Sequence, residues 1–70
     1  MLKDYNGAIS DCDHAIAIKS DYDKAYALRG ILKIEMGEKD GCNDLEKAGQ
    51  FGYQNAPIFL KKYCVNETPN

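Results

Sequence analysis

Two kinds of segment alternate along this chain of 70 residues. The first kind occupies 3–8 and returns at 37–42, so that Gly7 aligns with Gly41, 34 positions later. Two further pairs of segments match in the same way: 11–15 with 44–48, and 22–25 with 53–56. A repeat with a period of roughly 20–50 residues indicates stacked structural units, each of which buries its apolar face against its neighbours.

The apolar residues of every segment recur at the three- and four-residue spacing of an α-helix. The first predicted helix has a single apolar stripe, which consists of Tyr5, Ala8, Ile9, Cys12, Ala15 and Ile16. In the second the apolar residues spread around much of the circumference, which predicts a helix packed between two neighbours. We therefore predict four helices, at about 4–18, 22–36, 39–51 and 56–64.

Residues typical of turns and helix ends separate these segments. Ser20 and Asp21 form the first turn, and they can cap the second helix. Gly37 follows the second helix as a C-terminal capping glycine would. Asn55 can cap the fourth helix, while Pro57 suits its first turn. The last residues, 65–70, are predicted to form a flexible tail.

Small residues recur where two helices would approach closely. Ala8 and Ala15 lie seven positions apart in the first helix, and Tyr26 and Gly30 place an aromatic residue and a glycine in the second. Together with the repeat, these residues resemble the tetratricopeptide repeat family, whose unit is a helix pair, A then B, of about 34 residues. Arg29 departs from the family pattern, which has a leucine-like residue there.

The resemblance implies an all-α fold of tetratricopeptide-like antiparallel helical hairpins, an α-solenoid fragment. Its four helices would follow the order B-A-B-A within a single domain at 1–64. The ending Leu60 to Cys64 is also similar to the last helix of some bacterial members. Repeats of this family bury their apolar faces against one another, and three or more are usually needed for stability. This chain has one complete helix pair with a half unit on each side, which is fewer.

The function implied by the resemblance is protein–protein interaction, in which a helix-lined groove binds a peptide or a helix. Carried over to this sequence, the groove positions are Lys24, Ala27, Ile31 and Ile34. One subgroup of the family grips C-terminal carboxylates of chaperone tails with a Lys-x-x-x-Arg-Arg pattern. Lys24 and Arg29 match that pattern, whereas Leu28 replaces its first arginine, so half of the clamp is present.

The first helix is expected to lack a partner on one side. Its stripe includes Tyr5, Ile9, Cys12 and Ile16, and the second helix can cover only half of it. Either the chain is the C-terminal part of a longer array, or another copy supplies the cover. Because burial of one Ile side chain stabilises by about 1.5–3 kcal/mol, we predict self-association, with a homodimer as the expected form.

Charge and motif content argue against several other functions. Nine basic against eleven acidic residues give a net charge of −2, which does not favour nucleic acid or an anionic membrane as partner. The sequence has no apolar run long enough to span a bilayer and no signal peptide, so we expect a cytoplasmic location. It also contains no phosphate loop or nucleophile elbow. We expect neither an enzyme nor a cofactor.

The three cysteines leave an alternative function open. An odd number of cysteines excludes a full disulfide framework within one chain. Cys12 and Cys42 are predicted to be small buried core residues whose free thiols behave as hydrophobic groups. Cys64, near the end of the last helix, is the best candidate for an exposed thiol. Their spacing does not fit common zinc motifs, and His14 is interpreted as a surface residue. A cysteine-based redox or metal-binding protein, or an accessory segment of a larger enzyme, is the alternative.

Overall fold

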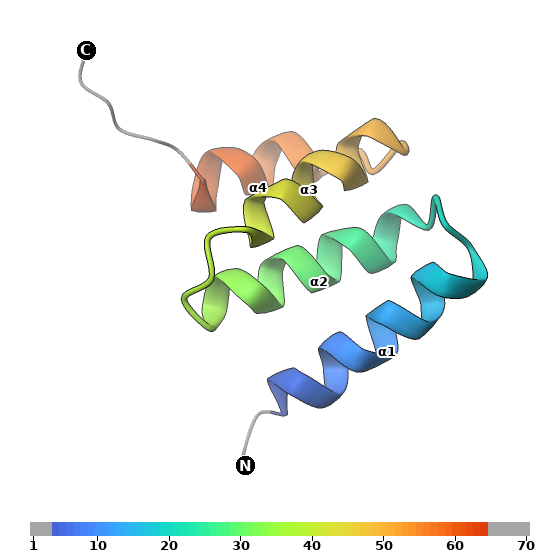
Figure 1. Cartoon of the computed structure of the whole chain (residues 1–70). Helices are drawn as coiled ribbons and strands as arrows, with labels where there is room; N and C mark the ends of the chain where they lie inside the picture. Colours follow the sequence, from blue (N-terminus) through green and yellow to red (C-terminus); the bar gives the residue numbers. More distant parts are fainter. Residues whose placement is uncertain (1–3, 65–70) are drawn as a thin grey trace.

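A computed structural model describes residues 4–64, which form antiparallel α-helical hairpins (Figure 1). The elements of this part of the chain are α1 (Tyr5–Ile18), α2 (Asp23–Glu35), α3 (Gly41–Gln50) and α4 (Ala56–Tyr63). Each helix packs against the next one in sequence, so that α2 lies between α1 and α3. The predicted all-α fold of helical hairpins is confirmed, while the predicted tail at 65–70 lies outside the described residues.

The core lies at the contact between α2, α3 and α4. Its centre consists of Ala27, Leu45 and Ala48, and the last two have no exposed surface. Partly buried side chains pack around this centre: Tyr26, Ile31, Ile34, Tyr53, Phe59, Leu60 and Cys64. The predicted position of the second helix between two neighbours is therefore confirmed.

Two glycines bring the backbones of α2 and α3 into close contact. A Cβ atom on Gly30 would lie 2.6 Å from the carbonyl oxygen of Gly41, which is closer than real Cβ contacts. A Cβ on Gly41 would in turn meet the carbonyl oxygen of Gly30 and the side chain of Ile34. The small residue expected at a close helix approach is thus found at Gly30, and its partner Gly41 is the residue that repeats Gly7.

Two helices end in the same hydrogen-bonded motif around a glycine in the left-handed region. Gly37, with φ of 91°, donates its N–H to Ile34 O, and the next residue, Glu38, donates to Lys33 O at 2.8 Å. The prediction for Gly37 is confirmed. At the end of α3, Gly52 has φ of 106° and serves the same purpose, which the sequence had not suggested.

The helix starts differ in part from the predictions. Asp4 caps α1 by accepting a hydrogen bond from the Gly7 N–H at 2.9 Å. Neither Ser20 nor Asp21 caps α2, because the N-cap position falls on Tyr22, whose side chain makes no capping bond. Asn55 does stand at the N-cap of α4, yet its side chain makes no capping hydrogen bond either.

Candidate functional site

The predicted groove residues of α2 fall into two groups. Lys24 is exposed, whereas Ile31 is half-buried and packs partly against the core, so Lys24 and the exposed part of Ile31 can contact a partner. Ala27 is only 2% exposed and belongs to the core, so it offers no surface to a partner. Ile34 packs towards α3, where its side chain approaches Gly41. The four positions therefore do not form one accessible groove, because the α2–α3 contact covers Ala27 and draws in Ile34.

One row of α2 remains accessible. Lys24, Leu28 and Ile31 follow the four- and three-residue spacing that aligns side chains along a helix. Leu28 is 49% exposed, which is a high value for a leucine on a helix that packs between two others. Lys24 and Leu28 also border a cleft of about 220 Å³ between α1 and α2, whose α1 side includes Cys12 and Ala15. We refer to Lys24, Leu28 and Ile31 as the open row.

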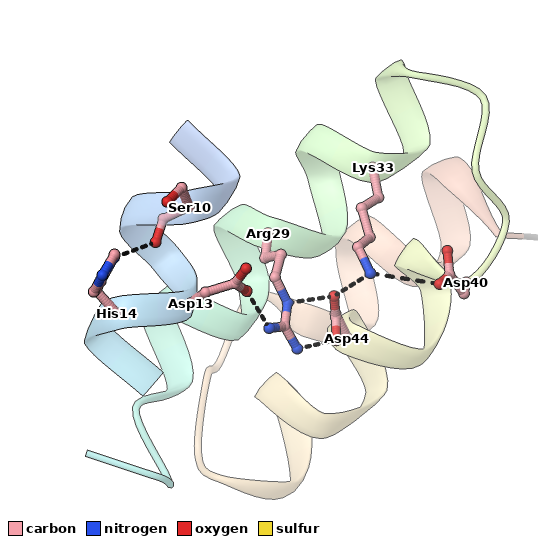
Figure 2. Close-up of polar contacts among 7 residues, drawn as sticks. All are labelled: Ser10, Asp13, His14, Arg29, Lys33, Asp40 and Asp44. Atoms are coloured by element: carbon pink, nitrogen blue, oxygen red, sulfur yellow. Dashed lines mark hydrogen bonds and ion pairs between the residues drawn. The ribbon is translucent and has the colours of Figure 1, made fainter. Parts of the chain in front are cut away.

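The opposite side of α2 carries an ion-pair network (Figure 2). Arg29 donates from Nε and Nη2 to the two carboxylate oxygens of Asp44 in α3, both at 2.9 Å. Its Nη1 donates to Asp13 Oδ1 in α1 at 2.6 Å, so one side chain joins three helices. Lys33 adds a contact to Asp40 Oδ2 at 3.4 Å.

This network satisfies Arg29 within the chain. The side chain of Asp44 is only 10% exposed and that of Arg29 is 20% exposed, so the bidentate pair is largely removed from water. Its hydrogen bonds to Asp44 raise the pKa of the Arg29 guanidinium above the usual range for arginine, against the opposing effect of burial. Arg29 therefore has two carboxylate partners already and is not a free half of a carboxylate clamp.

The predicted self-association stripe of α1 is partly covered. Cys12 is 4% exposed, whereas Tyr5, Ile9 and Ile16 are half-buried. The Tyr5 hydroxyl donates to Glu35 Oε1 in α2 at 3.1 Å, which holds the start of α1 against the end of α2. The stripe therefore faces α2, which covers Cys12 and leaves Tyr5, Ile9 and Ile16 partly exposed.

Two of the cysteines form a disulfide, and the prediction that Cys42 has a free thiol is wrong. The Cys42–Cys64 bridge joins the first turn of α3 to the residue after α4, with Cα atoms 6.0 Å apart. Cys64 is therefore not an exposed thiol either. Cys12 is free and buried, as predicted, and burial raises the pKa of its thiol.

Other candidate chemistry is sparse in the described part of the chain. His14 is exposed, and its Nδ1 lies 2.9 Å from the Ser10 carbonyl oxygen of the same helix (Figure 2). Between residues 4 and 64, His, Cys, Asp and Glu side chains do not form groups of three or more that could hold a metal ion. Over the same range, each helix is too short or too polar to cross a membrane.

Part of the chain is similar to a much longer protein. It is 40% identical over 55 residues to RNA polymerase II-associated protein 3 of Xenopus tropicalis, and equally to that of Xenopus laevis. The match includes 77% of this chain and 8% of each relative, so the chain spans about 8% of the length of these curated relatives. No protein-family profile and no solved structure matches the chain.

The sequence contained a signal for the missed disulfide. Cys42 stands at the start of one predicted helix and Cys64 at the end of the next. In an antiparallel hairpin these two ends lie side by side, so the cysteines come within bonding distance. An odd number of cysteines excludes complete pairing but leaves room for one bridge. Leu28 was missed because its place on an apolar helix made it resemble a core residue.

Proposed function

We propose that this chain is a tetratricopeptide-type module that binds a protein or peptide through the open row of α2. The observation that carries the proposal is the 40% identity over 55 residues, a length that exceeds one repeat unit. The alternating segments and the stacked hairpins support the same family. The name of these relatives describes association with RNA polymerase II. Applied to this chain, that name supports protein association as a class of function.

The exposure of the residues on α2 supports the open row as the contact surface. Lys24 and Leu28 are exposed and Ile31 is half-buried, whereas the other side of the helix is occupied by the Arg29 network. An apolar row with one terminal lysine suits an amphipathic helix or an extended peptide that carries apolar anchors and an acidic residue. Ala27 and Ile34 support this surface from the core.

Peptide display with a matched pair of variants tests the proposal. Peptides selected from a random library against the 70-residue chain would be titrated by fluorescence anisotropy. Leu28→Lys should weaken binding by about tenfold or more, because a buried apolar anchor contributes at least about 1.4 kcal/mol. Ile58→Lys changes an isoleucine of α4 that is 61% exposed and should leave the affinity unchanged. Equal effects of both variants, or the absence of selected peptides, would contradict the proposal.

We also propose that the chain forms a homodimer through the partly exposed apolar stripe of α1. Tyr5, Ile9 and Ile16 supply the apolar contact, and a two-fold axis would place each stripe against its copy. Light scattering after size exclusion should give twice 7.8 kDa. Ile16→Glu should yield the monomer, while Ile58→Glu should not. A stable monomer of the unaltered chain at high micromolar concentration would refute the dimer.

The proposed module has no catalytic function and takes no cofactor. Saturable turnover of a small molecule that one point mutation abolishes would contradict the first part. The Cys42–Cys64 bridge is the specific observation in favour of the alternative, a redox function, because disulfides are rare in reducing compartments. A further alternative is that the chain is an accessory segment of a larger enzyme. The observation that supports it is that the chain spans only about 8% of the length of its relatives.

A further inference from the structure

The attachment of α4 differs from that of the other helices. The helix has eight residues, fewer than α1, α2 or α3. Helices this short are marginal without tertiary contacts. Within residues 4–64, the ion pairs connect side chains of α1, α2, α3 and their connecting turns, and none of them includes a residue of α4. Apolar packing and the disulfide therefore hold α4 in place.

The packing surface of α4 is small. Ala56 is its one fully buried residue, and Phe59 and Leu60 are half-buried against the core. The Phe59 ring stacks between two tyrosines, with centroids 6.3 Å from Tyr53 and 6.2 Å from Tyr63. Phe59 and Leu60 pack against the core cluster that includes Leu45 and Ala48 of α3, both of which have no exposed surface.

The disulfide closes the open end of this hairpin. The connection around Gly52 joins α3 and α4 at one end, and the Cys42–Cys64 bridge joins them at the other, 22 residues apart in sequence. Closing a loop of that length restricts the undocked chain strongly. Both cysteines are half-buried, so the bridge is within reach of a small thiol.

We propose that the Cys42–Cys64 pair is a redox-controlled clasp for α4. While the bridge is intact, α4 stays docked on α3. When a dithiol reductant opens it, α4 detaches and uncovers the apolar side of α3 around Leu45 and Ala48, while α1, α2 and α3 remain packed. The clasp concerns the conformation of this chain and holds whether or not the open row binds a partner.

The reaction is ordinary thiol–disulfide exchange. A thiolate of the dithiol attacks one sulfur of the bridge and forms a mixed disulfide, and the other cysteine leaves as a thiolate that takes up a proton. The second thiol of the reductant, on losing its proton, displaces the first cysteine. Two electrons thus pass to the protein, which gains two thiols, while the reductant becomes a disulfide. Cys12 stays outside this exchange because its free thiol is buried.

Hydrogen exchange in the two redox states tests the clasp. The Cys12→Ala chain, which keeps the pair as its only cysteines, would be compared after oxidised glutathione and after dithiothreitol. Alkylation and mass spectrometry would count the thiols. Reduction should lower the protection of α4 amides by about 100-fold, the effect expected for opening a loop of this length, and change that of α2 amides by less than about threefold. Dithiothreitol should have no effect on the Cys42→Ser/Cys64→Ser variant, whose α4 should already be unprotected.

Three results would overturn the clasp. Equal α4 protection in both redox states would show that packing alone holds the helix. An equal loss in α2 and α4 would make the bridge a general brace of the whole fold. Two free thiols after treatment with oxidised glutathione would show that the pair does not close in solution.

Discussion

The three-helix body of α1, α2 and α3 and the final helix α4 are held together by different forces. In the body, Gly30 and Gly41 bring two backbones into contact, and Arg29 joins three helices through carboxylates. On the other side of α3, α4 is attached by aromatic and aliphatic contacts and by one covalent bridge. Glycine contacts and ion pairs do not respond to redox conditions, whereas a disulfide does. The attachment of α4 therefore includes one bond that a reductant can break, whereas the ion pairs and glycine contacts of the body do not depend on redox conditions.

The same substitution in both regions should give the largest contrast. Gly30→Ala should destabilise the chain by about 3 kcal/mol or more, because its methyl group would meet the backbone oxygen of Gly41 and force the helices apart. That is a large share of the total for a domain of this size. Thermal or urea unfolding followed by circular dichroism would measure the loss.

Gly49→Ala is the matched control at the α3–α4 contact. Its Cβ would lie 3.2 Å from the Ala56 Cβ, so a shift of a few tenths of an ångström in α4 can accommodate it. The higher helix propensity of alanine, up to about 1 kcal/mol, offsets the remaining crowding. The expected change is within about 1 kcal/mol of zero. If both variants lost equal stability, the close α2–α3 approach would not be the feature that fixes the body.

Removing the central charge should have the next largest effect. Arg29→Met would leave the buried Asp44 with only the Lys33 ammonium, 4.0 Å away, and should cost about 2–3 kcal/mol. Asp13→Asn removes the exposed partner instead and should cost less than about 1 kcal/mol. Urea unfolding at low and high salt would compare them. If Asp13→Asn lowered the free energy of unfolding as much as Arg29→Met, the exposed Arg29–Asp13 pair would be the main source of stability.

A smaller effect, confined to α4, is expected from its central aromatic residue. Phe59→Ala should weaken the docking of α4 by about 1–2 kcal/mol, less than for a fully buried ring because Phe59 is half-buried. Ile58→Ala, at a residue that is 61% exposed, should change little. Amide exchange would show the Phe59→Ala loss in α4 but not in α2. A loss spread over all four helices would mean that α4 is part of the body.

Sequence periodicity predicted the fold better than it predicted the candidate site. The repeat and the apolar spacing located the four helices within a few residues, and Gly37 was assigned correctly because a C-terminal glycine has a local signature. Ala27, Arg29 and the disulfide depend on which residues meet across helices. A single sequence does not specify those contacts. In the sequence Arg29 was only a departure from a family pattern, whereas in the structure it donates hydrogen bonds to Asp13 and Asp44.

The smallest expected effect is a pH dependence of the free energy of unfolding, which arises from Cys12 in α1. Burial raises the pKa of the Cys12 thiol, so the unfolded chain loses this proton first as the pH rises through about 9, the usual value for the group. The folded state then binds more protons than the unfolded state, and stability falls with pH across this window. Arg29 remains charged there, and bridged Cys42 and Cys64 do not titrate. Urea unfolding of the oxidised chain between pH 7 and 10 should show the decline, and Cys12→Ala should remove it. If Cys12→Ala kept the full slope, a group other than the buried thiol would be responsible.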